Sequence, residues 1–204
     1  MTQPISNWRD ALADYVREQA KPIEKFGHQP RLYALTQQIG ATETYDDDIV
    51  YAAAYLHDLG VFLGHRPEDP IALAAWNNVT YAIAKAPAIL RDLGFPDEKI
   101  PAVLEAIRTH QPQFVPSTLE ATLLRDADIL EQLGAIGILR TVCKVGRDTR
   151  FHTFTDAIAS LQRALDELPQ LLTLPTSKAL AEPRTRALRD FLEATQNEAG
   201  TLLL

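Results

Sequence analysis

The chain has 204 residues, enough for one sizeable hydrophobic core and few for two independent domains. With 20 basic and 27 acidic side chains its formal charge is −7, which argues against a broad nucleic-acid-binding surface, because such a surface needs clustered positive charge. The single cysteine, Cys143, excludes a disulfide framework and any zinc site built from several thiolates.

The first expected helices are marked by local start and stop signals. Asn7 is placed to cap a first helix, and Pro22 kinks or interrupts it. A second helix is expected from about His28 to Ile39, with Gly40 as its stop. The triplet Asp46-Asp47-Asp48 puts negative charge at the start of a third helix, where the helix dipole favours it. We interpret the triplet as a solvated helix start rather than a metal site.

The third helix is expected to carry the pair His57-Asp58 and to end near Gly60. Further helical periodicity covers residues 71–93 (with a kink or a new start at Pro87), 97–109, 118–145 (interrupted in pattern by Gly134 and Gly137), 155–172 and 176–197. No run of residues reads as a strand. The sequence therefore predicts an all-α protein with a single domain, residues 1–204, with motif-bearing helices at about 26–145 and C-terminal helices at about 155–197.

No segment predicts a membrane protein. The first ten residues lack a cationic start followed by an apolar stretch, so no signal peptide is expected. The apolar run from Ile49 to Leu56 is far shorter than the ~20 residues that a spanning helix needs. A cytoplasmic location is the expectation.

The pair His57-Asp58 closes that apolar run and is the main chemical signal. Neither side chain is cheap to bury without a partner, and neighbours in a helix point about 100° apart, so both can reach one ion. Three residues elsewhere in the chain strengthen the signal, namely His28, His110 and Asp126. A set of two histidines and two carboxylates, His28, His57, Asp58 and Asp126, suits Mn²⁺, Fe²⁺, Co²⁺, Ni²⁺ or Zn²⁺ better than Ca²⁺.

The order His … His-Asp … Asp in a helical chain resembles the HD-domain superfamily of metal-dependent phosphohydrolases. The segment His28-Gln-Pro-Arg31-Leu-Tyr resembles the His-x-x-Arg-Val segment of small bacterial single-domain members. The segment Asp126-Ala-Asp128-Ile-Leu-Glu-Gln-Leu-Gly134-Ala-Ile-Gly137-Ile-Leu-Arg140 is similar to the signature Asp-Ala-Asp-x-Leu-Glu-x-x-Gly-Ala-x-Gly-x-x-Arg of that branch. The resemblance covers roughly Phe26 to Leu192.

The resemblance implies an HD-type helical bundle and assigns roles residue by residue. The metal ligands would be His28, His57, Asp58 and Asp126, with Asp58 essential for catalysis. His110 would be a catalytic residue, as a phosphate contact or a proton donor. Arg31 and Arg140 would bind an anionic substrate, although either could instead pair with a buried carboxylate.

The function that the resemblance implies is metal-dependent hydrolysis of a small phosphorylated metabolite, with a nucleotide as the favoured example. Two departures keep alternatives open. Val61 stands where several HD nucleotidases have an acidic residue, and between Asp58 and Asp126 the chain has only His65 and His110, which predicts one metal ion rather than two. The alternatives are hydration of a nitrile-like group, an iron-dependent oxygenase, and a non-catalytic HD binding module. A small-molecule partner is expected, with no nucleic acid and no membrane.

Overall fold

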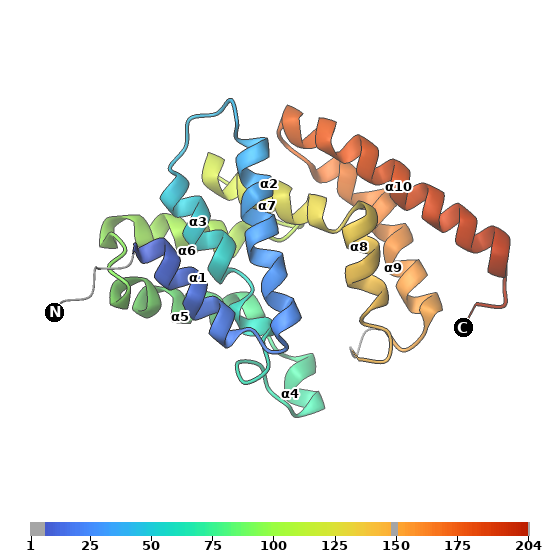
Figure 1. Cartoon of the computed structure of the whole chain (residues 1–204), viewed down its shortest axis with the longest axis horizontal. Helices are drawn as coiled ribbons and strands as arrows, with labels where there is room; N and C mark the ends of the chain where they lie inside the picture. The colour runs from blue at the N-terminus through green and yellow to red at the C-terminus, as the bar shows by residue number, and fades with distance from the viewer. Residues whose placement is uncertain (1–6, 148–150, 204) are drawn as a thin grey trace. The chain divides into compact units, whose positions relative to one another are not determined.

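The computed structural model describes residues 7–147 and 151–203, and the regular secondary structure in these ranges is helical, without a β-strand (Figure 1). The predicted all-α class is confirmed. Among the described residues, none of the helices combines the length and the apolar character that a bilayer crossing requires. The chain forms two compact units, Met1–Arg125 and Asp126–Leu204, and a single domain stays a prediction.

The first unit is built around a central apolar helix. Its elements are α1 (Trp8–Gln19), η1 (Ile23–Gly27), α2 (His28–Ile39), α3 (Asp47–Leu56), η2 (Leu59–Val61), α4 (Pro70–Ala74), α5 (Asn78–Asp92), η3 (Asp97–Lys99), α6 (Ile100–Thr109) and the start of α7 (Leu119–Glu131). Every residue from Ile49 to Leu56 is buried, and α3 packs against α1, α2 and α6. A helix that is apolar all round belongs inside the core, and α3 fits this rule.

The local signals place the first two helices correctly. The side chain of Asn7 accepts a hydrogen bond from the backbone N–H of Arg9 and caps α1. Helix α2 has the predicted bounds, with Gly40 as its C-cap. Helix α3 is shorter than expected, because it ends at Leu56 and leaves Asp58 in the following turn. The His-Asp pair is therefore not carried by the body of the helix.

Two other helix boundaries correct the sequence-based expectation. Pro87 does not start a helix but lies inside α5, and the break falls earlier, between α4 and α5. There the side chain of Asn77 caps α5 by accepting from the N–H of Thr80 at 2.9 Å, so a capping side chain and not the proline sets the helix start. The expected helix over 118–145 is two helices, because α7 ends at Glu131 and α8 begins at Gly134, whose φ is +72°.

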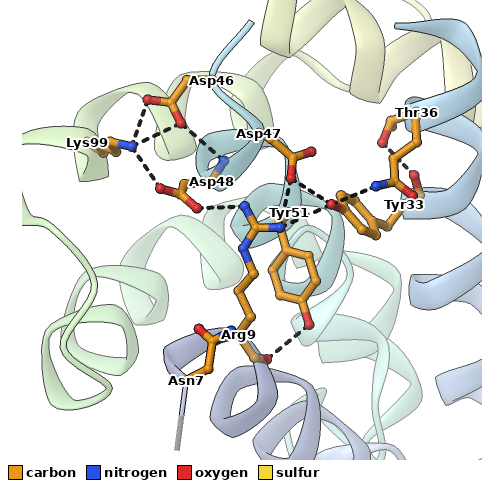
Figure 2. A network of polar contacts seen from close by, with 10 residues as sticks. Asn7, Arg9, Tyr33, Thr36, Asp46, Asp47, Asp48, Tyr51 and Lys99 are labelled. Carbon is orange, nitrogen blue, oxygen red and sulfur yellow. Dashed lines mark hydrogen bonds and ion pairs between the residues drawn. The ribbon is translucent and has the colours of Figure 1, made fainter. Parts of the chain in front are cut away.

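The acidic triplet begins α3 as predicted, but its charges are paired rather than solvated (Figure 2). Arg9 donates to Asp47 at 2.7 Å and to Asp48 at 2.6 Å, and Lys99 donates to Asp46 and Asp48. The hydrogen bond from Lys99 holds the pKa of Asp48 below its ordinary value. These ion pairs join α1 and η3 to the start of α3.

Tyr33 adds α2 to this network. Its hydroxyl donates to Asp47 at 2.7 Å and lies 3.1 Å from Arg9 Nη1 (Figure 2). Burial, followed by this contact with the carboxylate, raises the pKa of Tyr33 to about 12. The network therefore fixes the N-terminal end of the helix whose other end carries His57.

The second unit contains the rest of α7 together with α8 (Gly134–Val142), α9 (Phe154–Glu167), η4 (Leu168–Leu171) and α10 (Pro175–Ala199). Helices α8, α9 and α10 pack against one another. The fully buried carboxylate of Asp126 accepts from the backbone N–H groups of Thr173 and Leu174, directly before α10. Arg140 donates to the buried carboxylate of Glu131 at 3.0 Å, which is the pairing that the sequence left open.

Candidate metal centre

Three metal-ligating side chains of the first unit converge on one point. His28, His57 and Asp58 each offer one ligand atom, and these atoms all lie within 4.8 Å of one another. The two histidine Nε2 atoms are 3.2 Å apart, and Asp58 Oδ2 lies 3.8 Å from the Nε2 of His28 and 3.6 Å from that of His57. In the described part of the chain, no other group of three histidine, cysteine or acidic side chains meets the same condition.

The size of this triangle fits a transition-metal ion. A point equidistant from the three atoms lies about 2.1 Å from each, and zinc stands ~2.0–2.2 Å from its nitrogen and oxygen ligands. Both imidazoles are buried, with His57 only 1% exposed, whereas the Asp58 side chain is 21% exposed. Asp58 is therefore the most exposed of the three candidate ligands.

The hydrogen bonds of His57 prepare it to be a ligand. Its Nδ1 lies 3.0 Å from the backbone carbonyl of Ala54, and a carbonyl can only accept, so the neutral ring carries its proton on Nδ1. This tautomer puts the lone pair on Nε2, which faces His28 and Asp58. A metal-binding histidine commonly donates its other N–H in this way, which fixes the orientation of the ring.

The cluster is assembled from helix ends. His28 is the first residue of α2, His57 is the C-cap of α3, and Asp58 precedes η2. The partial negative charge at the C-terminus of α3 favours a cation beside His57. The sequence expectation that one helix body presents both members of the pair is wrong, but the turn after α3 brings the two side chains together.

His110 lies next to this cluster and is buried. It is the C-cap of α6, only 3% exposed, and its ring packs edge-on against the ring of His57 with 5.0 Å between the centroids. Its Nδ1 donates to the carbonyl of Ile107 at 2.6 Å, which leaves the lone pair on Nε2. His110 therefore lies beside the candidate metal ligands in a buried position, and its catalytic role stays a prediction.

The HD-domain family model matches residues 26–133, which is more than half of the chain. The protein belongs to the HD-domain family. No curated protein matches the sequence. The family accounts for the cluster, since HD domains bind divalent metals and the matched region contains all three of its side chains.

Solved structures of other bacterial proteins share the fold. An HD-superfamily hydrolase from Bacillus thuringiensis is 21% identical, with a TM-score of 0.68 and coverage of 96% of this chain and 98% of that one. Bacillus subtilis YpgQ in complex with ADP is 22% identical, with a TM-score of 0.71 and 96% of each chain covered. A predicted HD-superfamily hydrolase from an uncultured Thermotogales bacterium is 22% identical, with a TM-score of 0.63 and coverage of 94% and 92%.

The remaining residues assigned by the family resemblance divide between the two units. Arg31 is exposed on α2, and its guanidinium lies against Gly27, directly before His28. Asp126 and Arg140 belong to the second unit, where they contact the start of α10 and Glu131 respectively. Ligation by Asp126 and substrate binding by Arg31 and Arg140 stay predictions from the HD-family resemblance.

Sequence reasoning missed the side chains of other elements that contact residues 57–61, the turn after α3, which we call the HD turn. Lys25 Nζ donates to the carbonyl of Val61 at 2.7 Å, and Trp76 Nε1 donates to the carbonyl of Gly60 at 2.9 Å. Asn78 Nδ2 donates to Asp58 Oδ1 at 3.3 Å. The partners are 16 to 36 residues apart along the chain, and no local pattern of the sequence marks them.

Proposed function

We propose that this HD protein is a metal-dependent phosphohydrolase that acts on a small phosphorylated metabolite. The observation that carries the proposal is the triangle of His28, His57 and Asp58, which has the size and the donor types of a transition-metal site. A divalent ion held there would lower the pKa of water and polarise a phosphoryl oxygen.

The metal itself favours an anionic substrate, because a divalent ion can coordinate phosphoryl oxygens directly. Two neutral imidazoles and the Asp58 carboxylate leave the ion a net positive charge, which the predicted fourth ligand, Asp126, would neutralise. His110 supports proton transfer beside the cluster, since its proton on Nδ1 is committed to Ile107 and its Nε2 can accept or, once protonated, donate. Arg31 is the nearest candidate along α2 for a contact with phosphate, because it follows His28 by one helical turn.

The substrate class that we propose first is a nucleotide. Its support is the similarity in fold to YpgQ, which was solved in complex with ADP. A small molecule is the proposed partner, rather than a nucleic acid, because the chain carries a net charge of −7.

Metal analysis followed by an activity panel tests the proposal. The purified protein is expected to contain about one transition-metal ion per chain. Nucleoside mono-, di- and triphosphates are then incubated with Mn²⁺, Fe²⁺, Co²⁺, Ni²⁺ or Zn²⁺, and released phosphate and pyrophosphate are measured. The absence of release with every ion would reject the phosphohydrolase, and oxygen uptake with Fe²⁺ would favour the oxygenase instead.

The variant Asp58→Ala separates site chemistry from folding. It is expected to lose both bound metal and turnover, because it removes the one charged donor of the triangle. Its helical content should remain that of the parent, since the buried apolar core supplies most of the stability. If the variant keeps its metal content and turnover near parent levels, Asp58 is not part of the site.

A further inference from the structure

The two carboxylate oxygens of Asp58 have different neighbours. Oδ2 faces the Nε2 atoms of His28 and His57, at 3.8 and 3.6 Å. Oδ1 instead accepts a hydrogen bond from the side-chain amide of Asn78, at 3.3 Å. A carboxylate can only accept, so the amide group of Asn78 must present its nitrogen here. Oδ2 thus faces the two imidazoles, while Oδ1 is engaged by the amide of Asn78.

The backbone of Asn78 is fixed by its position at the start of α5 and by its close contact with Gly60. Asn78 is the first residue of α5, and the preceding residue, Asn77, caps that helix. The turn after Asp58 packs directly on it, because a Cβ atom on Gly60 would come within 2.7 Å of the carbonyl oxygen of Asn78 and 2.8 Å of its Cα. The indole of Trp76 also donates to the carbonyl of Gly60, so the start of α5 and the HD turn are joined at two points.

We propose that Asn78 is a positioning residue that restricts Asp58 to a single oxygen ligand. The amide occupies Oδ1 and aims Oδ2 at the point that the two imidazoles share. Because the amide is neutral, it orients the carboxylate without changing the charge of the site. A cluster with two nitrogens and one oxygen favours transition-metal ions, whereas Ca²⁺ prefers more oxygens and readily takes both oxygens of a carboxylate.

The inference rests on the proposed metal site and deepens it. Hydrogen-bonding partners behind metal ligands typically change metal affinity by 10- to 100-fold when they are removed. The variant Asn78→Ala is therefore expected to bind Co²⁺ about 10- to 100-fold more weakly than the parent. Its Co²⁺ visible absorption spectrum is expected to change as well, because Asp58 becomes free to rotate and to offer both oxygens.

Asn77→Ala is the matched control. Asn77 is the neighbouring asparagine on the same helix start, and its side chain accepts from Thr80 N. Its loss weakens the start of α5 but removes no hydrogen bond to Asp58. Asn78→Leu keeps most of the side-chain volume without the donor, so it serves if Asn78→Ala does not fold. Circular dichroism melting of each variant checks the fold before titration.

Titration with Co²⁺ alone, followed by absorption, decides the proposal. It is supported if either folded variant at position 78 weakens binding at least about tenfold and alters the spectrum while Asn77→Ala stays within about threefold of the parent. It is overturned if the position-78 variants bind as the parent does, or if Asn77→Ala loses as much affinity. A parent protein that does not bind Co²⁺ would overturn the metal site itself and this inference with it, which distinguishes the two failures.

Discussion

Gly60 sits where the HD turn and the start of α5 are in closest contact, so Gly60→Ala tests how rigidly the metal centre is held. The added Cβ would lie 2.7 and 2.8 Å from backbone atoms of Asn78, where ordinary contact begins at 3.4 Å. Relief requires a backbone shift of about 0.6–0.7 Å, because no flexible side chain can yield. A shift that separates residue 60 from Asn78 is expected to lengthen the hydrogen bond from Asn78 to Asp58, which at 3.3 Å is already long.

Overpacking of this kind costs about 1–3 kcal/mol, and the lower backbone entropy of the unfolded alanine variant offsets about 0.4–1 kcal/mol. The free energy of unfolding should fall by roughly 1–2 kcal/mol, which lowers the melting temperature by roughly 2–8 °C for a chain of this length. Thermal melting followed by circular dichroism measures this fall. Co²⁺ titration should show weaker binding in the same variant.

Gly27→Ala is the matched control beside the same centre. Its Cβ would lie 2.9 Å from Arg31 Nη1, the far end of a flexible side chain that can move away. The backbone of Gly27 is already helical, with φ −60° and ψ −16°, so alanine fits there. We expect its melting temperature to equal or exceed that of the parent. A melting temperature of Gly60→Ala equal to that of the parent, or an equal loss of stability in Gly27→Ala, would show that the contact between Gly60 and Asn78 is not tight.

Two further predictions concern a proton and a charge. The variant His110→Ala should keep its bound metal, and its turnover should fall about 10²-fold or more, because it has lost a proton-transfer group. Loss of the metal would instead show that the ring of His110 positions His57 as a ligand. The pKa of Asp48 is depressed by Lys99, so its stabilising effect is full above the ordinary value of 3.8 and is lost as pH falls through the lower folded value. The free energy of unfolding of Lys99→Met, measured in urea, should therefore fall less than that of the parent as the pH drops below about 4, and parallel curves would contradict this.

The sequence predicts the helices whose ends are marked by nearby residues. Helix α2 has its predicted bounds, and α1 begins after its capping Asn7. The break before α5 was missed because the helical periodicity continues across residues 71–93, and periodicity does not reveal that Asn77 caps a new helix. The early end of α3 was missed for a similar reason, since the apolar pattern continues past Leu56 into the turn.

The metal cluster was predictable in composition but not in its supports. His28, His57 and Asp58 were recognised from their types and order, and they do converge. The contacts that hold or neutralise charged groups join residues far apart in sequence, as with Arg9 and Asp47 or Asn78 and Asp58. Periodicity reports which face of a helix is apolar, but it does not report which polar tips meet across helices. The pairing of the Asp46–Asp48 charges was missed for the same reason.

Every side chain of the candidate centre stands at a helix terminus, and this placement bears on how the protein can diverge. His57 and Asp58 stand just before residues 62–69, and His110 stands just before residues 111–118, both of which connect helices. An insertion inside a helix turns all later residues by about 100° per residue, whereas a connecting segment can change length with little effect on the helices beside it. Residues 111–118 are mostly exposed and can therefore change length while the ligand triangle is retained. Residues 62–69 are more constrained, because Phe62 is fully buried and His65 contacts Gln19 and Tyr81. New substrate preferences can arise by loop replacement on an unchanged metal centre.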